Sequence, residues 1–177
     1  MQKKIYFENL DAIRFLCFLS VFFHHSFYTE SAEIQNSEWY LFITRTLFAN
    51  GNLGVNFFFV LSGFLITFLL IEEKKLNGKI SIVKFWMRRI LRIWPLYFSC
   101  LFFGFIIFPE IKSFFGQMPQ ETANPWMYIT FLSNFDIIYS DLPDASTLGV
   151  LWSIAIEEQF YIVWPILIYL IPFKKLW

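Results

Sequence analysis

One arginine and two histidines stand out within the apolar stretch 12–27, AIRFLCFLSVFFHHSF. Arg14 and His25 lie eleven positions apart, and at about 100° per residue this spacing returns to nearly the same helix face, about 16 Å further along the axis. His24 points about 100° away from that face. An arginine and an imidazole on one face can bind an anion and move a proton. The same side chains at the ends of a membrane helix can instead be interfacial anchors, and the spacing alone leaves both interpretations open.

A second group of polar side chains interrupts the apolar stretch 148–170, LGVLWSIAIEEQFYIVWPILIYL. Ser153, Glu157 and Tyr161 recur at every fourth position, which places them on one helix face. Glu158 points toward a neighbouring face. Carboxylates within a membrane helix are costly unless they have partners or water. We therefore expect a polar site here rather than a water-facing amphipathic helix, because the residues opposite the polar face are nearly all apolar.

A basic segment, MRRILRIWPLYF (87–98), carries Arg89 and Arg92 three positions apart. Their guanidinium groups can converge on a phosphate at the membrane surface. A basic segment is equally typical of the side of a membrane protein that stays in the cytoplasm. Cys17 and Cys100 have no second Cys or His at metal-ligand spacing, so we predict two reduced packing residues and no metal site.

The composition indicates that membrane helices position these side chains. The chain is 57% hydrophobic and 16% charged with a formal net charge of zero, which is too apolar for one soluble core and gives no reason to expect a nucleic-acid partner. A crossing helix needs roughly 20 residues. We therefore expect an all-α, polytopic membrane bundle of four or five transmembrane helices, in which a weak stretch either crosses or only re-enters. The apolar stretches lie at about 12–28, 54–71, 93–108 and 148–171, with the weak one at 126–140.

Loop charges predict the orientation in the membrane. Residues 72–92 form a strongly basic loop, which belongs in the cytoplasm. Residues 29–50 carry Glu30, Glu33 and Glu38 against one arginine, so this turn is expected on the opposite side. The N-terminus is then cytoplasmic.

Four motifs occur in order along most of the chain. They are Arg14 and His25 at an Arg-x10-His spacing, FFVLSGFL (58–65), RRILRIWP (88–95) and WSIAIEEQFYIVWP (152–165). In these motifs the chain resembles the acyltransferase 3 family of integral-membrane O-acyltransferases. The resemblance implies transfer of an acyl group, often acetyl, from a cytoplasmic acyl-CoA to a hydroxyl of a cell-envelope carbohydrate or similar acceptor. It also implies a multi-pass protein of a bacterial inner membrane.

The resemblance also implies a role for each candidate side chain. His25 is the expected catalytic base, acting directly or through a transient acyl-histidine, and Glu157 is its candidate catalytic partner. Arg14, Arg89 and Arg92 are the candidates for binding the phosphates of acyl-CoA (acetyl-CoA), which is a donor substrate and not a permanently bound cofactor. The expected partners are membrane lipid, acyl-CoA and a carbohydrate or lipid-linked acceptor.

Two departures from the family and two alternatives complete the expectations. The chain stops at IPFKKLW, whereas family members are longer, so residues 1–177 are expected to be a partial, N-terminal half of the membrane domain. Such a half is expected to have little activity alone, and a second polypeptide would supply its missing helices. Phe15 stands where the family commonly has a small residue. The alternatives are an inactive truncated fragment and a proton-coupled transporter subunit in which His25 and Glu157 relay protons.

Overall fold

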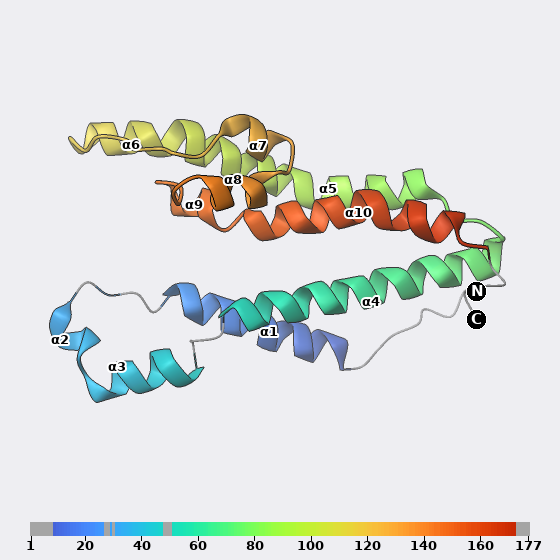
Figure 1. Cartoon of the computed structure of the whole chain (residues 1–177), viewed down its shortest axis with the longest axis horizontal. Coiled ribbons are helices and arrows are strands. Elements are labelled where there is room, and N and C mark those ends of the chain that lie inside the picture. The colour runs from blue at the N-terminus through green and yellow to red at the C-terminus, as the bar shows by residue number, and fades with distance from the viewer. Residues whose placement is uncertain (1–8, 27–28, 30, 48–50, 173–177) are drawn as a thin grey trace. The chain divides into compact units, whose positions relative to one another are not determined.

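The computed structural model describes residues 9–26, 29, 31–47 and 51–172 (Figure 1). Those residues form helices and no strand, which confirms the predicted all-α fold. The chain divides into two compact units, Met1–Leu69 and Leu70–Trp177. Each unit is described by itself.

The first unit contains one long helix, the beginning of a second, and short helices between them. These are α1 (Leu10–Ser26), α2 (Ala32–Gln35), α3 (Glu38–Phe42), the π-helical η1 (Ile43–Leu47) and the first part of α4 (Gly51–Asn77). Helices α1 and α4 approach each other closely at Gly54. A Cβ at this position would lie 2.9 Å from the carbonyl oxygen of Cys17 and 2.9 Å from Cγ2 of Val21. Only a glycine therefore allows the two backbones this contact.

The second unit is built on two antiparallel long helices, α5 and α10, which lie side by side (Figure 1). Its helices are α5 (Ile82–Phe102), the π-helical η2 (Phe103–Ile107), α6 (Phe108–Phe114), α7 (Pro125–Ile129), α8 (Ser133–Tyr139), α9 (Ser146–Gly149) and α10 (Trp152–Leu170). Helix α10 continues through Pro165. The buried core collects apolar side chains from the long and the short helices: Tyr97, Leu101, Ala123, Tyr128, Phe131, Ala145, Leu148, Leu151 and Ala155.

The basic stretch 72–92 is mostly helical, which corrects the prediction of a loop. Helix α4 ends before Gly78, whose positive φ of 71° is typical of the residue after a helix. Only residues 78–81 separate α4 from α5. The Glu73 carboxylate of α4 accepts a hydrogen bond of 3.0 Å from the backbone N–H of Ser81. This bond joins the last part of α4 to the start of α5.

Lys74 fixes the end of α10. Its buried ammonium donates hydrogen bonds to the carbonyl oxygens of Ile168 (2.7 Å), Tyr169 (2.9 Å) and Ile171 (2.6 Å). The last carbonyls of a helix have no partner within the helix and carry a partial negative charge. A lysine of α4 therefore supplies both the donors and the positive charge at this helix end.

Within the described residues, three helical stretches are long and apolar enough to cross a membrane. These are Leu53–Asn77, Ile82–Phe114 and Ser146–Leu170. The predicted count of four or five is therefore too high. Helix α1, with 17 residues, is at the lower limit for crossing. The weak stretch 126–140 is broken at Phe131, whose φ is 58°, into α7 and α8, and each of these is too short to cross.

Candidate active site

Helix α1 carries the predicted pair Arg14 and His25. The helix is continuous from Leu10 to Ser26, so the two side chains keep the spacing that places them on one face. Arg14 is half-buried, and its Nη1 lies 3.9 Å from Oδ1 of Asp11. His25 is exposed in the last turn. The face therefore offers one guanidinium and one accessible imidazole.

His24 has a different environment from its neighbour. A Cβ at Gly51 of α4 would lie 2.5 Å from Cγ of His24, so the His24 side chain packs directly on the glycine backbone. The rings of His24 and His25 touch edge to face, with centroids 5.3 Å apart. His24, which is exposed like His25, thus contacts α4 at Gly51.

Helices α5 and α10 bring three of the polar side chains together. The Tyr161 hydroxyl donates a hydrogen bond of 2.7 Å to Oε2 of Glu157. The Arg89 guanidinium lies over the Tyr161 ring, 5.2 Å from its centroid, and 5.5 Å from the centroid of Phe85. A cation over a phenol ring is favourable, more so where water is scarce. We call Arg89, Tyr161 and Glu157 the cation–phenol–carboxylate cluster.

Two of the predicted neighbours of this cluster lie outside it. Ser153 donates to the carbonyl oxygen of Val150 at 3.2 Å instead of joining Glu157, so the predicted polar face starts one turn later. Arg92 follows Arg89 by three positions on α5 and is exposed.

Glu158, not Glu157, is the buried carboxyl group of α10, and the sequence analysis left it without a role. It is only 4% exposed. Its Oε2 accepts a hydrogen bond of 3.1 Å from Nε1 of Trp94, while its Oε1 has no hydrogen-bond partner among the described residues. The buried residues of α10 recur at helical spacing: Ala155, Glu158, Tyr161, Pro165 and Ile168. This spacing was the signal in the sequence that could have identified Glu158.

Gln159 was also missed, and it joins α10 to the turn between α7 and α8. Its Nε2 donates to the carbonyl oxygen of Phe131 and to Oδ1 of Asn134, each at 2.8 Å. On the other side, the Tyr97 hydroxyl donates to the carbonyl oxygen of Tyr128 at 2.7 Å. Side chains from α5 and α10 therefore hold this turn from two directions.

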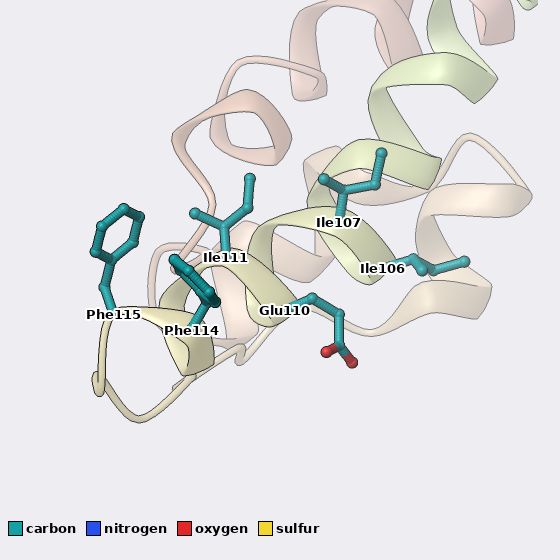
Figure 2. A pocket seen from close by; sticks show the side chains of 6 residues that line it. All are labelled: Ile106, Ile107, Glu110, Ile111, Phe114 and Phe115. Carbon is teal, nitrogen blue, oxygen red and sulfur yellow. The ribbon is translucent and has the colours of Figure 1, made fainter.

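A hollow along η2 and α6 is not part of either group. Figure 2 shows the side chains that line it: Ile106, Ile107, Glu110, Ile111, Phe114 and Phe115. Glu110 is the one charged residue of this lining, and no predicted site residue contributes to it. The hollow is an apolar surface feature and not the candidate active site.

The predicted site residues thus fall into two groups on different units. Arg14 and His25 belong to the first unit, and Arg89, Arg92 and Glu157 belong to the second. Within the second unit, Arg89 and Glu157 contact the same tyrosine. The catalytic and donor-binding roles of all five stay predictions.

Comparison with known proteins gives the family. A family model described as an acyltransferase domain matches residues 7–177. The O-acetyltransferase OatA of Staphylococcus aureus is 34% identical over 173 residues, which cover 92% of this chain and 25% of that protein. The peptidoglycan O-acetyltransferase OatA of Listeria monocytogenes is 32% identical over 168 residues, covering 90% of this chain and 24% of that protein. No solved structure matches the chain.

The chain spans about a quarter of the length of these relatives. The family model, in contrast, covers nearly the whole chain, including both groups of candidate residues. Together with the three candidate spans, these similarities make the protein a membrane protein. It belongs to the acyltransferase 3 family.

Proposed function

We propose that the protein is a membrane O-acyltransferase that moves an acetyl group from acetyl-CoA to a hydroxyl of a cell-envelope carbohydrate. The observation that carries this proposal is the cation–phenol–carboxylate cluster of Arg89, Tyr161 and Glu157 within apolar helices. Polar groups at such positions are costly to keep and are usually functional. The relatives named O-acetyltransferases support acetyl as the transferred group, and one of them is named for peptidoglycan.

The donor side of the proposed site consists of arginines. Coenzyme A carries several phosphate charges, and a guanidinium binds phosphate oxygens through paired N–H donors. Arg92 is exposed and therefore available for such a contact, and Arg89 is half-buried close by on the same helix. Arg14 on α1 is the third candidate for the donor phosphates.

The transfer step assigns the chemistry to His25. The imidazole accepts the proton of the acceptor hydroxyl, and the oxygen then attacks the thioester carbonyl carbon. A new ester bond forms, the carbon–sulfur bond breaks, and the coenzyme A thiolate leaves and takes up the proton from the imidazolium. A transient acyl-histidine is the alternative route for the same overall exchange. Glu157 is the proposed catalytic partner of His25.

The proposed orientation places acetyl-CoA on the cytoplasmic side of a bacterial inner membrane. It rests on the basic residues at the end of α4 and the start of α5, on the acidic residues between α1 and α4, and on the rule that basic residues stay in the cytoplasm. In this orientation the N-terminus is cytoplasmic.

Thiol labelling in intact cells tests the orientation. Lys79 and Glu33 are both exposed, so a cysteine at either position is accessible once Cys17 and Cys100 are replaced. A membrane-impermeant reagent should label the cysteine at 33 and not the one at 79. Labelling at 79 without labelling at 33 would reverse the orientation and contradict a cytoplasmic donor.

Acetyl transfer in isolated membranes tests the function. Membranes from cells that express the intact protein are incubated with radiolabelled acetyl-CoA and a carbohydrate acceptor, and alkali-labile acetyl esters on the acceptor are measured. We expect ester formation that is lost with His25→Ala at equal protein level. Equal ester formation by wild-type and His25→Ala membranes would contradict the proposal.

A further inference from the structure

The proline of α10 changes the hydrogen bonding of one carbonyl group in that helix. In a regular α-helix the N–H of each residue binds the carbonyl oxygen four positions earlier. Pro165 has no N–H, so it cannot bind the Tyr161 carbonyl oxygen, although α10 continues to Leu170. Tyr161 is only 4% exposed, and a carbonyl group without a partner is costly among apolar helices. Another part of the unit must therefore supply a donor.

Trp86 of α5 is that donor. Its Nε1–H binds the Tyr161 carbonyl oxygen at 3.0 Å. The indole group has one donor and no acceptor, so this single bond satisfies all of its hydrogen-bonding capacity. Pro165 leaves an acceptor open on α10 and Trp86 occupies it. We call Trp86 and Pro165 the indole–proline pair.

The bond from Trp86 holds the backbone of a residue whose side chain belongs to the cation–phenol–carboxylate cluster. The Tyr161 hydroxyl is bound to Glu157, and the Tyr161 ring lies beneath the Arg89 guanidinium. Trp86 and Arg89 are three positions apart, which places them on the same side of α5. The side of α5 that binds the Tyr161 backbone therefore also places the guanidinium over the Tyr161 ring.

A second indole group binds α10 further along α5. Trp94 donates to Oε2 of Glu158 at 3.1 Å, and in the antiparallel pair of helices this contact lies beyond Arg89 (Figure 1). The two tryptophans are eight positions apart, about 12 Å along the axis. Of the two bonds, only that of Trp86 ends on the backbone of α10, which has no rotamers. This bond therefore sets the register of α5 against α10 most directly.

We propose that Trp86 and Pro165 are positioning residues for Arg89. The bond between the indole and the carbonyl group that Pro165 leaves open keeps Tyr161 beneath the guanidinium that binds the donor phosphates. This inference rests on the proposed donor-binding role of Arg89. In Pro165→Ala, the restored N–H binds the Tyr161 carbonyl oxygen within α10, and the indole loses its acceptor. The substitution thus separates the stability of α10 from the position of Arg89.

A double-mutant cycle tests the pairing without any need for activity. Unfolding of the intact protein in detergent is followed by circular dichroism for Trp86→Phe, Pro165→Ala and the double variant. Trp86→Phe should raise the unfolding equilibrium constant about three- to tenfold more when Pro165 is present than in the Pro165→Ala background, the range of hydrogen bonds between membrane helices. Trp94→Phe is the matched control, because its acceptor is a carboxyl group, and it should cost the same in both backgrounds.

An equal loss for Trp86→Phe in both backgrounds would overturn the proposal. Should Trp86→Phe alone fail to fold, its recovery by Pro165→Ala is the expected result. Failure to fold in both backgrounds would overturn the pairing as well.

Acetyl-CoA kinetics test whether the pair acts on Arg89. Both single variants are expected to raise the KM for acetyl-CoA several-fold with kcat largely kept, and Pro165→Ala should do so without loss of stability. An unchanged KM in Pro165→Ala beside a raised KM in Arg89→Lys would show that the pair only stabilises the helices, which overturns the proposal. An unchanged KM in Arg89→Lys itself would contradict the proposed donor-binding role of Arg89, and the unfolding cycle would still decide whether the indole–proline pair exists.

Discussion

The two groups of candidate residues differ in how firmly their surroundings hold them. On α1, His25 is exposed, and about a third of the Arg14 side-chain surface is accessible to solvent. On α10, Glu157 binds a tyrosine hydroxyl and Glu158 binds an indole N–H. His25 is therefore accessible to substrates, whereas neighbouring side chains hold both carboxyl groups of α10. Substitution of His25 should change the reaction, and loss of the contact to the buried Glu158 should first change stability.

The largest expected effect comes from the adjacent histidines. His25→Ala should lower acyl transfer by about 10²–10⁴-fold, because that is the usual loss when a general base is removed. His24→Ala should be comparatively mild in activity, because its side chain packs on Gly51 of α4. Both variants are compared in membranes at matched protein levels. If His24→Ala is inactive and His25→Ala is active, the assignment of the catalytic role to His25 is wrong.

The next effect separates stability from activity on α5. Trp94→Phe removes the N–H that binds Oε2 of Glu158 and leaves a buried carboxyl group without this partner, which should cost about 1–3 kcal/mol of unfolding free energy. Unfolding of the purified protein in detergent is followed by circular dichroism. Trp126→Phe is the matched control, because Trp126 is 74% exposed. Equal stability of the two variants would mean that the hydrogen bond from Trp94 to Glu158 does not stabilise the folded protein.

A smaller effect is expected from the cation over the Tyr161 ring. Arg89→Lys keeps the charge but loses the planar group that lies over the ring. We expect the KM for acyl-CoA to rise by up to about tenfold, because an ammonium group does not offer a phosphate the paired N–H donors of a guanidinium, with kcat largely kept. Arg88→Lys, on an exposed residue of the same helix, should leave both values near those of the wild type. A fall in kcat at constant KM would assign Arg89 to the chemical step instead.

The smallest effect is a dependence of stability on pH. The Lys112 ammonium, which binds both carboxylate oxygens, and the N–H of Gln120 hold the pKa of Asp144 below its usual range. The folded state therefore gains stability above the unfolded pKa of about 3.9, and this gain is lost as pH falls through the lower folded pKa. Melting temperatures of wild-type and Asp144→Asn proteins should differ at pH 6 and converge toward pH 3. A constant difference across this range would contradict the assignment.

The sequence predicted much of the helical framework because membrane helices leave a strong compositional signal. The apolar stretches 54–71 and 148–171 correspond to the long α4 and α10. The predicted helix boundaries were less accurate. Helix α5 starts at Ile82, well before the apolar stretch that begins at 93, and its first turns contain basic residues that are typical of a loop. The weak stretch 126–140 was ambiguous, because in its α8 part the apolar Ile138 faces outward while the polar Ser133 and Asp136 face the core.

The site was predicted only as far as spacing along single helices allows. The Tyr161–Glu157 bond follows from residues four positions apart on α10. Contacts between helices, such as Trp94 with Glu158 and Lys74 with the end of α10, depend on which helices pack together and in what register. Periodicity along one helix contains no such information, so Glu158 was left without a role although its helical spacing marks it as buried.

Separate measurement of donor binding and acyl transfer tests the proposed roles of His25 and Arg89 most directly. The binding of radiolabelled acetyl-CoA to reconstituted protein and the rate of ester formation are measured for His25→Ala and for Arg89→Leu. The account predicts that His25→Ala binds acetyl-CoA like the wild type and forms no ester, whereas Arg89→Leu binds acetyl-CoA more weakly. Loss of acetyl-CoA binding in His25→Ala to the same extent as in Arg89→Leu would contradict the account.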